Sequence, residues 1–212
     1  MTTIKLFRVQ DVIECCLNQI KQWGYVTKAA LTDPKDQWRA TWQQTYKQLL
    51  GAKSNPVHDI DLVENVFKDI ESHMYEKRNN GYIPEMLATI NYARKNGYKI
   101  TSKMLPTFCG YINRLHVQQL IDNAPQTKCR VLDKELATLI YYDSELDKGT
   151  NKLRTNYMFR LSDGSVVLYR LPGKRFIKDM NKQFVITCDN IKQTFYNHRW
   201  IKQLYQGKIE LV

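Results

Sequence analysis

Two runs of β-forming residues surround the dipeptide Asp163-Gly164, within the segment Tyr157–Leu171. Asp-Gly between such runs is among the strongest short signals for a β-hairpin, because both residues tolerate the positive φ angles of a tight turn. We therefore predict a hairpin over residues 157–171. Any fold proposed for the chain must accommodate antiparallel strands in this region.

A two-residue turn would also determine which side chains of this hairpin share a face. It sets Leu161 opposite Val166 and builds one apolar face from the side chains near them. The opposite face would then carry Arg160 and Tyr169 among aliphatic residues. A guanidinium can hold a phosphate while a base stacks on a neighbouring ring, so we expect nucleic-acid contacts from both.

The first 125 residues follow a different period, with apolar side chains three and four positions apart, as on one face of a helix. Val12, Cys16 and Ile20 form such a face, and Gly24 follows where a helix would end. Pro84 stands where the first turn of another helix is expected. This part of the chain is predicted to be mainly helical.

The polar segment 123–128 separates these two patterns. We predict a helical domain over residues 1–125 and a basic α+β module over residues 126–212. The expected fold class is α+β, with a mainly helical N-terminal region and a small antiparallel module made of the hairpin and a C-terminal helix. Residues 131–142 fit either a strand or a short helix.

The C-terminal helix of that module is predicted over residues 190–206, with Asp189-Asn190 as its cap. One face of this helix is the candidate contact surface, because polar side chains recur along it at spacings of four, three and four. Lysine and arginine there would neutralise phosphates, and tyrosine and glutamine would donate hydrogen bonds to sugar or base. The residues on this face are Lys192, Tyr196, Arg199 and Gln203.

The formal net charge is +11, and most of it lies late in the chain. Residues 148–212 hold 13 Lys and Arg against 4 Asp and Glu, whereas residues 1–125 hold 16 against 12. A field of this strength attracts polyanions, of which nucleic acid is the commonest. We expect electrostatic capture by Lys174, Arg175, Lys178, Lys192, Arg199 and Lys202.

The sequence carries few signals for membranes or for oxidising compartments. No stretch approaches the roughly 18 apolar residues of a membrane span, and the N-terminus has no signal-peptide core. The five cysteines are scattered and odd in number, which is typical of reduced packing residues. We therefore expect a cytoplasmic protein without membrane contacts.

Motifs for catalysis and cofactors are absent from the sequence. No glycine-rich phosphate loop or Gly-x-Ser-x-Gly motif occurs, and no His or Cys residues stand at metal-ligand spacing. The sequence thus indicates no cofactor, no metal and a non-enzymatic role. One enzymatic alternative is a metal-dependent nuclease whose carboxylates come from Asp133, Glu135, Asp143, Glu145 and Asp147.

These observations favour a nucleic-acid-binding protein, with DNA preferred over RNA, that acts as a transcriptional regulator or as a replication accessory factor. The alternative is an adaptor or inhibitor. Its helical region would dock a protein partner, and its basic module would cover an acidic or nucleic-acid-binding surface of that partner. The candidate anchors for such an interface are the four tryptophans, Trp23, Trp38, Trp42 and Trp200.

Overall fold

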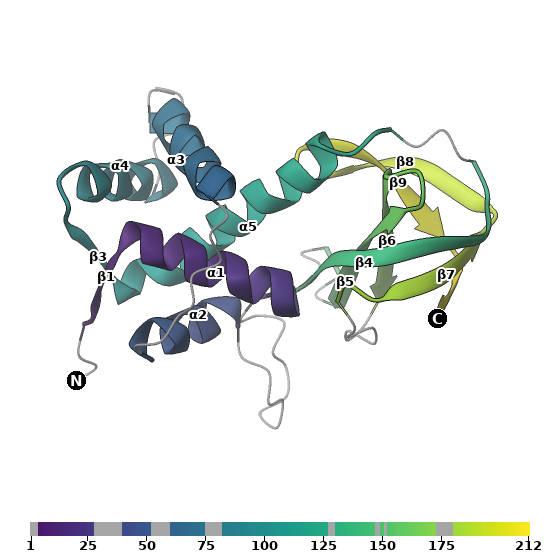
Figure 1. The fold of residues 1–212 in the computed structure, drawn as a ribbon, viewed down its shortest axis with the longest axis horizontal. Helices are drawn as coiled ribbons and strands as arrows, with labels where there is room; N and C mark the ends of the chain where they lie inside the picture. Colours follow the sequence, from purple (N-terminus) through teal and green to yellow (C-terminus); the bar gives the residue numbers. More distant parts are fainter. Residues whose placement is uncertain are drawn as a thin grey trace. The chain divides into compact units, whose positions relative to one another are not determined.

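The computed structural model of the chain describes residues 4–27, 40–51, 60–74, 82–126, 130–146, 149–150, 152–172 and 180–212. They belong to two compact units, one made of Met1–Gln19 and Thr41–His116 and the other of Ile20–Ala40 and Val117–Val212. The first unit is mostly helical, and the second is built on a β-sheet (Figure 1). Each unit has its own buried core.

Helices account for most of the described first unit. The helices are α1 (Val9–Trp23), α2 (Thr41–Leu50), α3 (Ile60–Met74), α4 (Tyr82–Lys95) and α5 (Leu105–Asp122), and the parts of α1 from Ile20 and of α5 from Val117 belong to the second unit. Two short antiparallel strands, β1 (Leu6–Arg8) and β3 (Lys99–Thr101), pair beside them, and the 3-10 turn η2 (Ser102–Met104) leads into α5. The predicted helical character of this region is therefore present.

Helix α1 forms for the reasons that its sequence suggests. Val12, Cys16 and Ile20 are fully buried along one face, so the three-and-four spacing does mark the core side. The helix ends at Gly24, whose φ of +68° is the left-handed conformation typical of helix C-caps. An added Cβ there would lie 2.5 Å from the ring of Tyr142, so glycine is also required for space.

The second unit contains a mixed sheet of eight strands. Their bounds are Tyr25–Val26 for β2, Leu132–Leu146 for β4, Leu153–Leu161 for β5, Val166–Pro172 for β6, Gln183–Cys188 for β7, Asn190–Tyr196 for β8, Arg199–Tyr205 for β9 and Lys208–Leu211 for β10. The strand order is β10-β7-β4-β5-β6-β9-β8, and β2 pairs with β4. The β6–β9 and β2–β4 pairs are parallel, and the other pairs are antiparallel.

This sheet must curl strongly. Strands β7 and β8 lie on opposite sides of the strand order, yet a single residue, Asp189, connects them. Neighbouring strands are about 4.8 Å apart, so a flat sheet could not be bridged by one residue. The curl encloses an apolar core on one face of the sheet, and its buried members are Leu132, Ala137, Leu139, Tyr142, Tyr157, Phe159, Leu161, Val167, Tyr169, Phe184, Ile186, Cys188 and Leu204.

The prediction of a small antiparallel module is wrong, because a large mixed sheet occupies the C-terminal part of the chain. The ambiguous segment 131–142 lies mostly in β4. The predicted helix over residues 190–206 is also wrong, since β8 and β9 form an antiparallel hairpin there. Aromatic and β-branched residues are frequent in this stretch, and they favour strands.

The predicted hairpin over residues 157–171 is present as β5 and β6, but its register differs by one residue. Phe159 lies opposite Val167 because the loop has three residues, Ser162–Gly164, instead of two. The Gly164 N–H donates to the Leu161 carbonyl at 3.0 Å, and Gly164 takes a φ of +82°. A one-residue shift moves side chains to the other face. Tyr169 consequently joins the core instead of sharing a face with Arg160.

Other sequence expectations concern thiols and membranes. Cys15, Cys16, Cys109 and Cys188 are buried thiols, and Cys129 lies outside the described residues. Within the part of the chain that the structure describes, no helix has the length and apolar character needed to cross a membrane.

Candidate nucleic-acid interface

The hairpin of β8 and β9 turns tightly at Asn197 and His198. Both residues have positive φ angles, +49° and +63°, as a two-residue turn of the primed type requires. The turn sets Phe195 directly opposite Trp200 and Tyr196 directly opposite Arg199. Because side chains alternate along a strand, these two pairs lie on opposite faces of the hairpin.

One face of the hairpin displays aromatic rings to solvent. Phe195 is 55% exposed and Trp200 is 64% exposed, and their ring centroids are 5.3 Å apart with planes inclined by 63°. The imidazole of His198 stands at 90° to the Phe195 ring, with a centroid distance of 6.4 Å. Gln193 and Lys202 form the next cross-strand pair on this face. We call these five side chains the aromatic face.

The opposite face of the hairpin is attached to the rest of the second unit. Arg199 forms two hydrogen bonds with Asp122 of α5, from Nε at 2.6 Å and from Nη2 at 2.9 Å. The hydrogen bond with Asp122 raises the pKa of the Arg199 guanidinium above its ordinary value. Gln118 donates from Nε2 to the Asn197 carbonyl at 3.4 Å. These contacts hold the turn against the end of α5.

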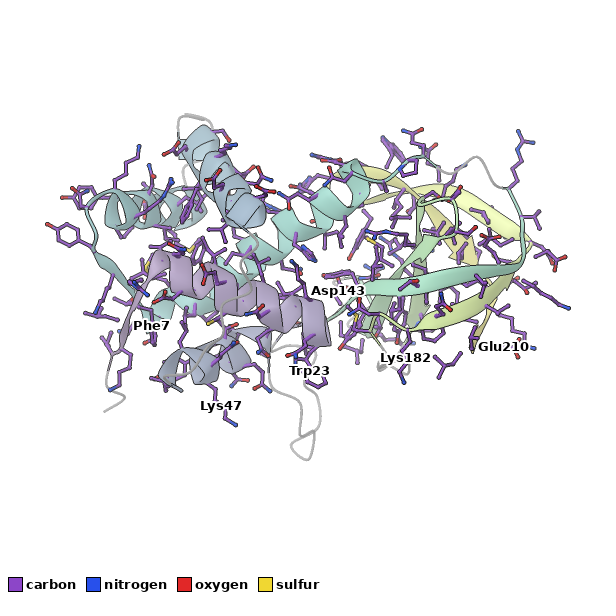
Figure 2. The ribbon with its side chains drawn as sticks, in the orientation of Figure 1. Phe7, Trp23, Lys47, Asp143, Lys182 and Glu210 are labelled. Atoms are coloured by element: carbon purple, nitrogen blue, oxygen red, sulfur yellow. The ribbon has the colours of Figure 1, made fainter. Side chains whose placement is uncertain are left out.

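A second attachment joins the hairpin to the middle of the sheet through Asp143, which is labelled in Figure 2. The Asp143 carboxylate accepts hydrogen bonds from the Tyr196 hydroxyl, from Asn156 Nδ2 at 2.5 Å and from the Tyr141 hydroxyl at 3.2 Å. The guanidinium of Arg170 lies 5.2 Å from the centroid of the Tyr196 ring. Strands β4, β5, β6 and β8 are thus linked by one polar network.

Positive charge lies on both faces of the β8–β9 hairpin. The sequence from Asn190 to Ile209 contains four Lys and Arg residues and no Asp or Glu. Lys192 is exposed on the face opposite the rings, with its ammonium 5.7 Å from the centroid of the Tyr205 ring, and Lys202 is half-buried on the aromatic face. Arg199 contributes less to this field because Asp122 compensates its charge.

The structure brings together only some of the predicted binding residues. Lys192, Tyr196, Arg199 and Lys202 all lie on the β8–β9 hairpin. Arg160 is exposed at the end of β5, on a different strand pair. The residues Lys174, Arg175 and Lys178 lie outside the described residues.

Tyr169 has a structural role in place of the predicted contact role. It is buried in the core of the sheet, and its hydroxyl donates to the Gly207 carbonyl at 3.0 Å. Burial raises the pKa of this hydroxyl above its ordinary value. A base therefore has no exposed ring to stack on at this position.

The carboxylates proposed for a nuclease that the structure describes do not gather into a metal site. Glu135 accepts a hydrogen bond from the Ser162 hydroxyl, whereas Asp143 belongs to the polar network described above. Asp147 lies outside the described residues, and so does the side chain of Glu145. Among the side chains that the structure does describe, no three His, Cys, Asp or Glu residues are grouped as a metal ion would require.

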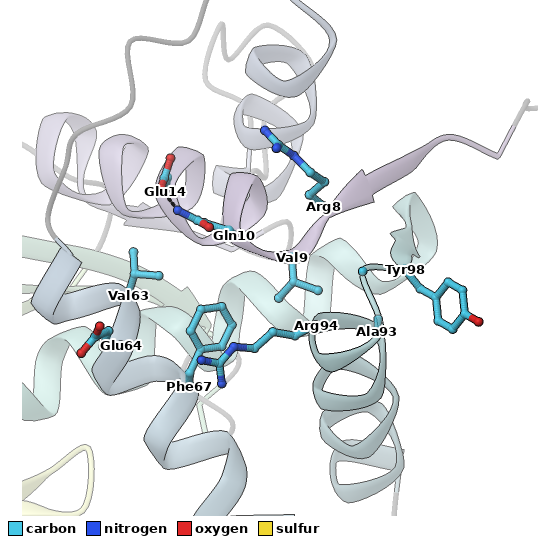
Figure 3. Close-up of a pocket in the computed structure, with 11 residues that line it drawn as sticks. Arg8, Val9, Gln10, Glu14, Val63, Glu64, Phe67, Ala93, Arg94 and Tyr98 are labelled. Atoms are coloured by element: carbon cyan, nitrogen blue, oxygen red, sulfur yellow. Dashed lines mark hydrogen bonds between the residues drawn. The ribbon is translucent and has the colours of Figure 1, made fainter.

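The first unit holds a pocket of about 470 Å³ between α1, α3 and the end of α4 (Figure 3). Val9 and Phe67 line its apolar part. Some of its polar side chains are engaged within the protein: the Arg94 guanidinium lies 3.8 Å from the centroid of the Phe67 ring, and Gln10 donates to Glu14 at 2.8 Å. The pocket therefore supports ligand binding less well than the aromatic face does.

Similarity to known proteins was sought in protein-family models, curated proteins and solved structures. No match was found. A functional proposal for this chain therefore depends on its own residues and their geometry.

The sequence contains a signal for the aromatic face, although Phe195 and His198 were not among the predicted binding residues. Phe195 and Trp200 stand symmetrically about Asn197-His198 within β-forming residues. Asparagine is one of the residues that readily adopt the left-handed conformation of tight hairpin turns. The usual signal is Asn-Gly, and histidine in place of glycine hides the turn.

Proposed function

We propose that this protein binds nucleic acid through the aromatic face of the β8–β9 hairpin. The observation that carries the proposal is the cross-strand pair of Phe195 and Trp200, both more than half exposed on a hairpin that is anchored on its other side. Exposed aromatic rings beside positive charges are the arrangement on which bases stack while their phosphates are neutralised. DNA is the first ligand to test.

Two energetic contributions support this proposal. Base stacking on an aromatic side chain is worth roughly 1–3 kcal/mol per base, and the aromatic face offers two large rings. Lys202, on the same face as the two rings, adds a contact with phosphate that releases counterions and makes the affinity depend on salt. The absence of acidic residues between Asn190 and Ile209 means that no carboxylate of the hairpin itself repels the ligand.

The test is binding of a fluorescein-labelled DNA oligonucleotide, followed by fluorescence anisotropy at salt concentrations between about 50 and 200 mM. We expect Trp200→Leu to weaken binding roughly 5- to 150-fold, which corresponds to the loss of one stacked base. Lys202→Gln should reduce the slope of log affinity against log salt by about 0.7 to 0.9.

Two matched variants control for exposure and charge. Tyr92→Leu removes a tyrosine of α4 that is 62% exposed, and Lys47→Gln removes an exposed lysine of α2. Both substitutions lie in the first unit, so neither should change the affinity or its salt dependence by more than the error of the assay. If they act as strongly as Trp200→Leu and Lys202→Gln, the hairpin is not the binding surface.

Exposed tryptophan also anchors many protein interfaces, so an adaptor role is the alternative outcome of the same experiment. A protein that binds no oligonucleotide at any salt concentration, but loses a nuclease-resistant partner on Trp200→Leu, would refute the proposal and support the adaptor.

A further inference from the structure

We infer that the nucleic acid held by the aromatic face is single-stranded, with two bases separated from each other by the rings of Phe195 and Trp200. This inference depends on the proposed function and specifies its ligand. It follows from the angle between the two rings, from the accessibility of base faces and from the anchoring of the hairpin.

The angle between the rings excludes a continuous base stack across them. In a stacked strand, neighbouring bases are parallel and about 3.4 Å apart. The planes of Phe195 and Trp200 are inclined by 63°, and their centroids are 5.3 Å apart. Two bases that each stack on one of these rings must therefore diverge by a similar angle. A bound strand has to be unstacked at this step.

A duplex cannot supply such bases without melting. In double-stranded nucleic acid, each base face is covered by its neighbours, and only the base edges are accessible in the grooves. Phe195 and Trp200 carry no hydrogen-bond donor or acceptor for base edges except the indole N–H. Single strands expose base faces, and aromatic side chains bind those faces with little dependence on sequence.

Anchoring of the hairpin keeps this geometry from adapting to a duplex. Arg199 is bound to Asp122 by two hydrogen bonds, and Tyr196 is bound to Asp143. The residues that carry the exposed rings are adjacent to these anchored residues in sequence, so the two strands are held on their inner face. A surface ordered before binding loses less conformational entropy when a ligand binds.

The experiment measures the affinity of the full chain for four labelled probes of equal length: single-stranded DNA, single-stranded RNA of the same sequence, the DNA duplex, and an abasic strand that retains only the sugar-phosphate backbone. We expect at least one single strand to bind at least tenfold more tightly than the duplex and the abasic strand. The DNA and RNA arms distinguish which sugar is preferred.

Variants of Trp200 connect this preference to the hairpin. Trp200→Leu should reduce affinity for the single strand roughly 5- to 150-fold and leave duplex affinity nearly unchanged, whereas Trp200→Phe should retain most of the single-strand affinity because it keeps a ring. Trp200 is 64% exposed, so neither variant disturbs the core. A duplex that binds as tightly as the single strands, with the abasic strand weaker, would overturn the inference while leaving the proposed function intact. Equal affinity for all four probes would overturn both, because the abasic strand has no base to stack. Absence of binding to any probe would overturn both.

Discussion

Replacing Gly24 with alanine tests how tightly the end of α1 is packed in the second unit. Gly24 has a φ of +68°, and a Cβ at this position would lie 2.5 Å from the Tyr142 ring and 2.6 Å from the Tyr142 carbonyl oxygen. Tyr142 is fully buried, and its hydroxyl donates to the Trp23 carbonyl. Neither the ring nor the strand backbone can easily move away.

The expected loss of stability has two parts. The left-handed conformation costs an alanine about 1–2 kcal/mol, of which roughly 0.4–1 kcal/mol is offset by the reduced entropy of the unfolded chain. The close contacts with Tyr142 add about 1–3 kcal/mol, as for other insertions into a packed site. We therefore expect Gly24→Ala to lower the free energy of unfolding by about 2–4 kcal/mol.

Gly164→Ala provides the matched control because it lies in the same unit with a φ of +82° but has no atom closer than 3.7 Å to its added Cβ. Only the conformational part applies, so a loss of about 0.5–1 kcal/mol is expected. Urea unfolding of both variants, followed by far-ultraviolet circular dichroism, gives the two free energies. Equal losses for Gly24→Ala and Gly164→Ala would refute the role assigned to the Tyr142 contact.

Two further substitutions test polar contacts. Tyr196→Phe removes a hydrogen bond to the Asp143 carboxylate. We expect urea unfolding to show a free energy of unfolding lower by about 1.5–3 kcal/mol, the range for hydrogen bonds to charged groups. An unchanged urea midpoint would exclude Asp143 as an anchor of the hairpin. Burial is the main cause that raises the pKa of the Tyr111 hydroxyl, and the hydrogen bond to Asp69 is the second. Above about pH 10 the folded state therefore keeps a proton that the unfolded state releases. Stability should therefore fall as the pH rises above 10, and Tyr111→Phe should make that fall less steep; identical slopes for the two proteins would contradict this assignment.

The helical half of the fold was predictable because a helix of the first unit carries its own signal within a few turns. The face of α1 follows from the spacing of Val12, Cys16 and Ile20, and the stop at Gly24 follows from its position. A sheet depends on partners that are distant in sequence. Residues 131–142 fit two structures until their pairing with β5 and β7 is known, and no local pattern reveals that pairing.

The error over residues 190–206 has a specific cause. Lys192, Tyr196, Arg199 and Gln203 are spaced so that they share one face of a helix. The same four residues also share one face of a hairpin that turns at residues 197 and 198, where Lys192 pairs with Gln203 and Tyr196 pairs with Arg199. Grouping these residues was therefore compatible with both structures. The two structures differ in the opposite face: the hairpin places Phe195 directly opposite Trp200, whereas a helix would not bring these two rings together.

The choice of residues in the turn gives a further indication that this other face matters. A turn with two positive φ angles is most stable as Asn-Gly, and a non-glycine residue in the left-handed region costs about 1–2 kcal/mol. His198 occupies that position with a φ of +63°, and its ring lies perpendicular to that of Phe195. An aromatic contact of this kind stabilises the fold by about 0.5–1.5 kcal/mol, which only offsets the conformational cost, so histidine in place of glycine adds little stability. Histidine instead adds a polar ring to the aromatic face, which is what a surface that contacts bases and phosphates would gain from it.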